Sequence, residues 1–130
     1  MEKLEIQQRK LFDDLRHIDE NGNEYWFARE LQSAVNYAKW ENFHKVIKTA
    51  QIACKISQQN VADHFPEVRK MITIGKGGQR PQIDYKLSRY ACYLIVMNGD
   101  PRKNVIAWGQ TYFAVKTRQQ ELAELFDRLS

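Results

Sequence analysis

Apolar residues recur at helical spacing over several stretches of the sequence, most clearly between residues 40 and 55. At 100° per residue, five of them fall within one sector of about 80°: Trp40, Phe43, Ile47, Ala50 and Cys54. This spacing predicts a helix over 40–55 with one buried face. An adjacent sector of about 100° collects basic side chains and predicts a basic face beside the core: His44, Lys45, Lys48 and Lys55.

The first part of the chain predicts one peripheral helix and one short helix. Residues 1–15 are rich in charge and carry only a partial apolar stripe, which is typical of a helix at the periphery. Residues 28–35 predict a short helix, and Asn36 follows as a left-handed C-cap. This short helix and the 40–55 helix have the proportions of a helix-turn-helix, whose basic second helix would suit the major groove of DNA. A plain packed helix pair is the alternative.

Two further helices are predicted in the last third of the chain. Ser88 is positioned as the N-cap of a helix over 88–97 that is apolar nearly all round, which predicts a buried central helix. Asp100 is positioned as the N-cap of a long helix over 101–129. Its apolar residues follow a heptad spacing broken only at Gln119: Val105, Trp108, Tyr112, Val115, Leu122, Phe126 and Leu129. We expect the first half of this helix to complete the core, and the second half to pack on the N-terminal helix or on a second copy of the chain.

A first β-hairpin is predicted over 16–27. The dipeptide Asn21-Gly22 is the strongest two-residue turn signal, because both central residues of a type I′ turn need a positive φ. This turn would place Ile18 opposite Tyr25.

A second hairpin is predicted from strands over 71–74 and 83–87. The segment 75–81 between them is a glycine-rich basic loop. Its glycines allow close approach of the backbone to phosphate, and Lys76 and Arg80 supply positive charge. The loop lacks the spacing of a P-loop. A hairpin tip without a ligand is the alternative.

The size and composition of the chain predict one folded domain. The 130 residues are 43% hydrophobic, which is enough to build a core. We therefore expect a single α+β domain over 1–130, in which four to five helices pack with small antiparallel β-hairpins and a long C-terminal helix. The N-terminus lacks an apolar signal-peptide core, and the longest apolar run is too short to span a membrane. We expect a cytoplasmic protein with reduced cysteines and no membrane partner.

Positive charge is concentrated in the middle of the chain. Residues 39–118 hold 14 Lys and Arg against 5 Asp and Glu, whereas the remainder holds 6 against 11. This distribution predicts a positive face for nucleic acid or another polyanion, with scattered solvated charge as the alternative. The predicted phosphate contacts are Lys45, Lys48, Lys76, Arg80 and Arg89.

The sequence does not favour catalysis. His17, His44 and His64 are scattered, and none has a partner at metal-ligand spacing. Asp84 and Lys86 match the D-x-K fragment of some nucleases, but the alternating pattern places both on the solvent face without a second acid. We therefore expect a non-enzymatic protein without a cofactor or metal, and a metal-dependent nuclease is the least favoured alternative.

Three stretches resemble the bacterial DNA-damage-inducible protein D family. They are DENGNEYWFAREL over 19–31, LSRYACYLIVMNGDP over 87–101 and GQTYFAVKTRQQEL over 109–122. The first also looks like the opening of the wider BRO-type N-terminal domain, found in phage antirepressors and viral DNA-binding proteins. The resemblance covers nearly the whole chain from about Phe12. Asn36 stands where related domains often carry Gly, a neutral change because both residues tolerate a positive φ.

The resemblance implies a role in the bacterial SOS response. Family members are linked to antagonising RecA recombinase on single-stranded DNA, and BRO-type domains are linked to DNA binding. Members are usually longer than this chain, with a second part after its last residue. The favoured function is a non-enzymatic DNA-binding module that acts on DNA, on a RecA filament or on both. The alternative is a protein-interaction module whose C-terminal heptad mediates dimerisation or contact with RecA.

Overall fold

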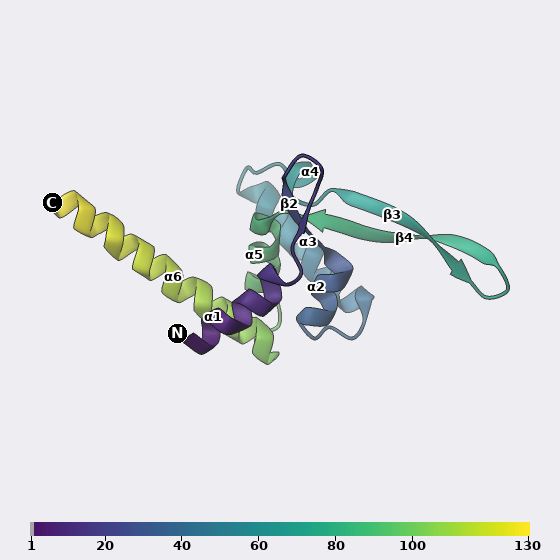
Figure 1. Ribbon diagram of the computed structural model, residues 1–130, viewed down its shortest axis with the longest axis horizontal. Helices are drawn as coiled ribbons and strands as arrows, with labels where there is room; N and C mark the ends of the chain where they lie inside the picture. Colours follow the sequence, from purple (N-terminus) through teal and green to yellow (C-terminus); the bar gives the residue numbers. More distant parts are fainter. Residues whose placement is uncertain (1) are drawn as a thin grey trace.

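The structure is a computed structural model that describes residues 2–130. Its elements are α1 (Glu2–Gln8), the π-helical turn η1 (Arg9–Asp13), β1 (His17–Ile18), β2 (Glu24–Phe27), α2 (Ala28–Ala34), α3 (Trp40–Ile56), α4 (Val61–His64), β3 (Glu67–Ile74), β4 (Gly78–Leu87), α5 (Arg89–Met97) and α6 (Asn104–Leu129). The strands form one antiparallel sheet in the order β1-β2-β4-β3. This architecture confirms the predicted α+β class and the long C-terminal helix (Figure 1).

The α5 helix lies at the centre of the core, as predicted. It packs against α3, α4 and α6 and against strands β2 and β4. Ser88 caps its N-terminus by accepting a hydrogen bond from the Ala91 N–H at 3.0 Å. Cys92 is fully buried in this helix, and its burial raises the pKa of the thiol. Cys54 of α3 is likewise a buried free thiol.

The predicted helix pair is confirmed by α2 and α3. Asn36 ends the first helix with a φ of 64°, the left-handed conformation predicted for it. The second helix buries four of the five predicted residues, Phe43, Ile47, Ala50 and Cys54, whereas Trp40 at its start is only half-buried. Helical periodicity alone was therefore sufficient to locate the core face of α3.

The first hairpin is one residue out of the predicted register. Ile18 does not pair with Tyr25, and the predicted type I′ turn is wrong because only Gly22 of the two central residues has a positive φ, of 82°. The Asp19 carboxylate accepts the Asn21 N–H at 2.9 Å, and the Asp19 carbonyl accepts the Gly22 N–H at 3.0 Å. These bonds close a three-residue loop, which adds one residue to the turn and shifts the pairing.

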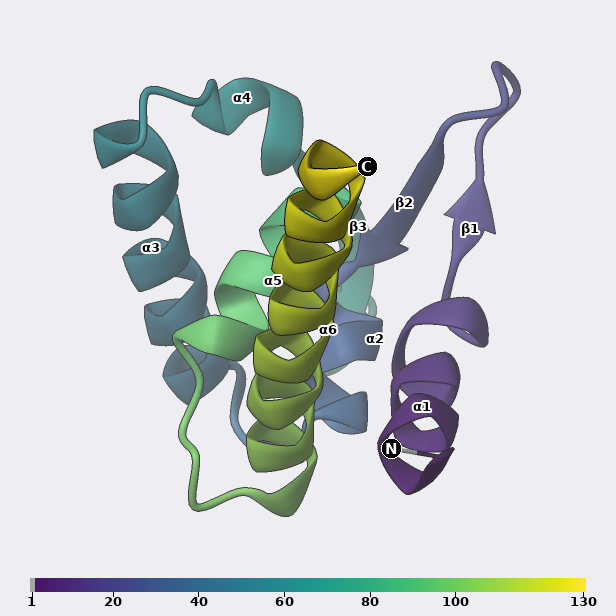
Figure 2. The ribbon, with the colours of Figure 1, turned by 90° about the vertical axis from the view of Figure 1, so that its left-hand side faces the viewer.

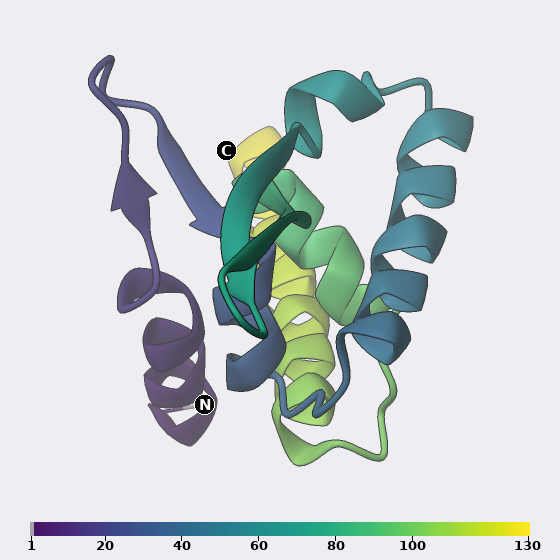
Figure 3. The same cartoon turned by 90° about the vertical axis from the view of Figure 1, so that its right-hand side faces the viewer.

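The second hairpin is much longer than predicted. Strands β3 and β4 pair from Glu67 with Tyr85 to Ile74 with Gly78, so only Gly75–Gly77 form the turn. Gly75 and Gly77 both have positive φ values there, of 50° and 91°. The outer part of this hairpin extends away from the helices (Figure 1), and it points toward the viewer in Figure 3. We call residues 69–82 the arm; within it only Ile72 and Gln82 are half-buried, and the others are exposed.

The last helix begins three residues later than predicted. The Asp100 carboxylate does not cap α6, because it accepts the Arg102 N–H at 2.9 Å and pairs with the Arg102 guanidinium. The Arg102 contacts hold the pKa of Asp100 at about 2. The Lys103 N–H donates to the Asp100 carbonyl, so residues 100–103 form a separate turn and α6 starts at Asn104.

The two halves of α6 have different surroundings. Its first half buries Ile106 and Gly109 against the core and is flanked by α1, whose Glu5 carboxylate lies 3.3 Å from the Lys116 ammonium. Residues 117–129 are all exposed and project from the body (Figure 1), and they point toward the viewer in Figure 2. Within residues 2–130, no helix is both long and apolar enough to cross a membrane.

Candidate nucleic-acid interface

The arm is a two-stranded ribbon whose charged side chains are all positive. Its only charged side chains are basic and exposed: Arg69, Lys70, Lys76 and Arg80. The nearest carboxylates along the chain, Glu67 and Asp84, lie at its base. Glu67 pairs with Arg69 at 3.1 Å, but both side chains are solvated and such a pair is weak. A ribbon of two strands has dimensions that fit the major groove of DNA.

A second basic cluster lies where the arm joins the body. The Arg29 guanidinium stacks on the Trp40 ring at 4.0 Å, and its Nε donates to the Ile83 carbonyl at 2.8 Å. Burial lowers the pKa of Arg29, and the neighbouring Arg80 cation lowers it further. These residues line an open cleft of about 300 Å³ together with Pro81 and other residues of β4. Arg29 extends the positive charge of the arm onto the body, although the exposed carboxylate of Glu41 also lines this cleft.

Asp84 is not on the solvent face, so that prediction is wrong. Its side chain is buried and accepts the backbone N–H groups of Arg29 at 3.1 Å and Tyr85 at 2.8 Å. The helix α2 starts directly after β2 with Phe27 at its N-cap, and Phe27 has no side-chain acceptor. The Asp84 carboxylate therefore caps α2 from the neighbouring strand. Lys86 is exposed and lies over the Tyr25 ring at 5.0 Å.

Removing the acceptor at Asp84 is expected to destabilise the domain. Asp84→Ala leaves the part-buried backbone N–H of Arg29, in the first turn of α2, without a hydrogen-bond partner. The free energy of unfolding should therefore fall by about 1–3 kcal/mol. Asp84→Asn retains an acceptor oxygen and should lose less. Chemical denaturation of the two variants measures the difference, and equal stability of Asp84→Ala and the parent chain would contradict the capping role.

Lys45 and Lys48 lie exposed on α3, as the sequence predicted. The helix contacts β4 through His44, whose Nε2 lies 2.9 Å from the Tyr85 hydroxyl. Burial lowers the pKa of His44 and the Lys48 cation lowers it further, whereas the Glu67 carboxylate raises it. Lys48 follows His44 by about one helical turn, so both lie on the same side of α3. The basic face of α3 thus starts beside the base of the arm, whereas Lys76 is at its tip.

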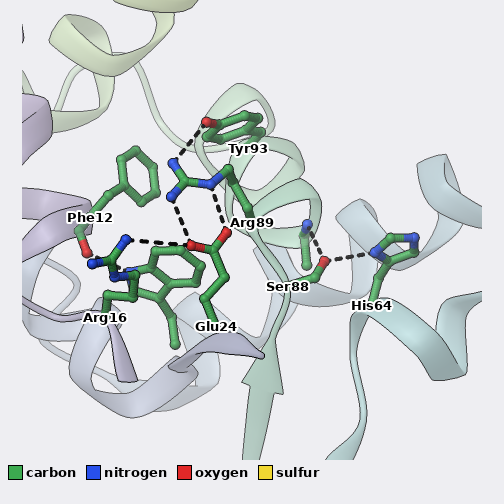
Figure 4. Close-up of polar contacts among 9 residues, drawn as sticks. Phe12, Arg16, Glu24, His64, Ser88, Arg89 and Tyr93 are labelled. Carbon is green, nitrogen blue, oxygen red and sulfur yellow. Dashed lines mark hydrogen bonds and ion pairs between the residues drawn. The ribbon is translucent and has the colours of Figure 1, made fainter. Parts of the chain in front are cut away.

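Arg89 occupies a different environment from the other four predicted contacts. Its guanidinium donates two hydrogen bonds to the Glu24 carboxylate, at 2.8 and 3.0 Å, and a third to the Tyr93 hydroxyl at 3.3 Å (Figure 4). The bonds to Glu24 are the main reason that the pKa of Arg89 is raised. The residue lines a cleft with Phe12 and Tyr112, away from the arm. This geometry ties α5 to β2, and a phosphate contact by Arg89 stays a prediction.

Substitution of Arg89 separates the two roles. Because the Arg89–Glu24 pair is partly solvated, Arg89→Gln should lower the free energy of unfolding by only about 1 kcal/mol. If the residue serves only the fold, the affinity of the domain for DNA should stay within about twofold under conditions where both chains are folded. A larger loss of affinity, measured by fluorescence anisotropy, would establish the predicted phosphate contact.

Sequence reasoning missed three basic residues of this surface. Arg69 and Lys70 belong to a strand that was predicted to begin at residue 71. Arg29 reaches the base of the arm only because α2 starts beside β4, where its side chain contacts Ile83, 54 residues further along the chain. Only the excess of basic residues over 39–118 signalled that the middle of the chain carries such a surface. Among residues 2–130, no group of three or more His, Cys, Asp or Glu side chains is placed to hold a metal ion.

The fold and the site define a class of small α+β domain in which a helical body carries a projecting basic ribbon. Residues 14–114 match the BRO family, N-terminal domain, and the chain belongs to this family. The chain is also similar to DNA damage-inducible protein D of Escherichia coli (strain K12), with 48% identity over 113 residues. That match covers 87% of this chain and 41% of the relative, so the chain spans less than half of its length. No solved structure matches the chain.

Proposed function

We propose that this chain is a non-enzymatic DNA-binding module that regulates the response to DNA damage. The arm carries the proposal, because it presents four cations without a carboxylate on a ribbon that stands clear of the body. The BRO family and the name of the relative support a regulatory role in DNA damage. We place this activity in the bacterial cytoplasm, where the chromosome lies.

The proposed binding is mainly electrostatic. The arm enters a groove or follows the backbone, and its cations displace counterions from the phosphates. Lys45 and Lys48 extend the contact along α3, where they bind phosphates of the DNA backbone next to the stretch that the arm holds. Since phosphate contacts carry no sequence information, binding should depend strongly on salt and weakly on sequence.

The biological target of this binding is DNA, a RecA filament on DNA, or both. A basic arm suits either target, because the filament also contains a phosphate backbone. We therefore extend the proposal to antagonism of RecA within the SOS response, as the resemblance to the protein D family implies.

Titration of labelled single-stranded and duplex DNA with the purified domain tests the proposal. Binding at low salt that weakens steeply at moderate salt is the expected result, with the DNA intact in the presence or absence of magnesium. Absence of binding at low salt would overturn the proposal. Cleavage only with magnesium would replace it with a metal-dependent nuclease whose acidic residues are not the buried Asp84.

A protein-interaction module is the second candidate, and the free half of α6 favours it. Four large apolar side chains there are exposed by 47–79%: Leu122, Leu125, Phe126 and Leu129. A helical segment this short and this exposed gains stability from a partner, such as α6 of a second copy. Light scattering over a range of concentrations tests this candidate: a dimer supports it, and a monomer at all concentrations argues against self-association.

A further inference from the structure

The outer face of the sheet combines aromatic and basic side chains from all four strands. We define the outer face by His17 of β1, Tyr25 and Phe27 of β2, Lys86 of β4 and Lys70 of β3. The register places them together, because His17 pairs with Tyr25 and Phe27 pairs with Lys86 across neighbouring strands. All three rings are half-buried, and both lysines are exposed.

The three rings form a continuous cluster. The His17 ring stacks on Tyr25 with a centroid distance of 5.3 Å and an interplanar angle of 19°. It meets Phe27 edge-on at 5.0 Å, and Tyr25 meets Phe27 edge-on at 5.3 Å. Glu30 holds His17 in place, with its carboxylate 2.7 Å from Nε2. The rings are therefore fixed in position before any ligand arrives.

The two lysines lie directly over these rings. The Lys86 ammonium is 5.0 Å from the Tyr25 centroid, and the Lys70 ammonium is 4.2 Å from the Phe27 centroid. At such exposed sites a cation–π contact is weak, so each ammonium can exchange the ring for a stronger anionic partner. A phosphate next to a stacked base is such a partner. For Lys86, three carboxylates that line one cleft with Lys86 and Tyr25 compete with such a phosphate: Asp19, Glu24 and Asp63.

The opposite face of the same strands has a different role. Trp26, Tyr85 and Leu87 alternate with the residues of the outer face and are buried in the core. The outer rings are therefore not needed to fill the core. Half-exposed rings flanked by cations on a sheet are the arrangement on which unpaired bases stack in single-strand-binding proteins.

We propose that the outer face binds the unpaired bases of a DNA strand whose adjoining duplex is held by the arm. Unpaired bases stack on Tyr25 and Phe27, and Lys86 and Lys70 turn from the rings to the phosphates. Lys70 also belongs to the arm, and Lys86 and Arg80, six positions apart on β4, are separated by about 20 Å along the strand. One bound molecule can thus reach both surfaces. This inference rests on the proposed function, because it assigns the arm to duplex DNA.

The test compares a blunt duplex with the same duplex carrying a single-stranded DNA tail. The parent domain should bind the tailed duplex more tightly, by about fivefold or more for each stacked base. Tyr25→Leu and Phe27→Leu keep an apolar side chain but remove the ring, so each should lose most of this advantage while binding the blunt duplex as before. Tyr25→Trp keeps an aromatic ring for stacking and should therefore retain the preference for the tailed duplex. Tyr112→Leu on α6 is the matched control and should behave like the parent.

Several outcomes would overturn the inference while leaving the proposed function intact. One is equal binding of the tailed and blunt duplexes. Another is full retention of the advantage when the tail is abasic, since phosphates alone would then explain it. Loss of the advantage in Tyr112→Leu, or tighter binding of an RNA tail, would also contradict it. By contrast, a domain that binds the tail but no blunt duplex would contradict the role of the arm.

Discussion

Neutralising the arm is expected to weaken DNA binding by about 100-fold or more at low salt. The variant replaces its four basic side chains with glutamine: Arg69, Lys70, Lys76 and Arg80. Each charge-assisted contact with a phosphate is worth about 1 kcal/mol or more, and the four lie together on one ribbon. Fluorescence anisotropy with a labelled duplex measures the loss. Circular dichroism should show an unchanged fold, because these side chains are exposed.

A matched control removes the same charge elsewhere. Its four glutamines replace exposed basic residues from the acidic ends of the chain: Lys3, Arg9, Lys10 and Arg128. Net charge falls equally in the two variants, so a general loss of attraction would affect both. We expect the control to lose less than about tenfold in affinity. Equal losses in the two variants would contradict a specific role for the arm.

Truncation of Phe43 is expected to have the largest effect on stability. The side chain is fully buried on α3, where its ring lies 5.2 Å from that of Tyr37. Phe43→Ala should lower the free energy of unfolding by about 3–5 kcal/mol, because it removes apolar contacts and leaves a cavity. The same change at Phe126, which is 73% exposed on the free half of α6, should alter stability by less than about 0.5 kcal/mol.

Chemical denaturation of the two alanine variants at several protein concentrations makes this comparison. A small effect at Phe43 would contradict the assignment of the α3 face to the core. A large effect at Phe126 that grows with concentration would show that a second copy covers α6. The comparison of Phe43→Ala with Phe126→Ala therefore also tests whether the exposed half of α6 binds a second copy of the chain.

Regular elements were predictable where a local pattern determined them. The spacing of Phe43 and Ile47 located the buried face of α3, and Asn36 and Ser88 marked the ends of helices through their own backbone and side-chain preferences. These signals act over a few residues, so they need no knowledge of the tertiary fold.

The errors arose where a side chain acts on another segment or on a turn. The Asp19 carboxylate reorganised the first hairpin, and Asp84 capped α2 from a strand 55 residues away. Pro81 lies in β4 although proline usually interrupts strands. It is tolerated because β4 pairs only with β3 at this position, so no second neighbour requires its N–H. The length of the arm followed from this pairing and was therefore not predictable from the local pattern.

The candidate site was predicted in part. Lys76 and Arg80 both lie on the arm, and Lys45 and Lys48 are exposed on α3, whose His44 contacts Tyr85 of β4. Charge counting located the four cations of the arm within the basic middle of the chain, but it did not include Arg29, which lies outside residues 39–118. It could not distinguish these residues from Arg89, because the Glu24 partner that engages Arg89 lies 65 residues away in sequence.

The dependence of duplex affinity on salt tests the central claim most directly. On a plot of the logarithm of the binding constant against the logarithm of salt concentration, each neutralised phosphate contributes a slope of about −0.9. If the arm makes the phosphate contacts, the arm variant should have a slope shallower than the parent by about 3 to 4 units. Parent and arm variant with the same slope would contradict the proposal that the arm binds DNA.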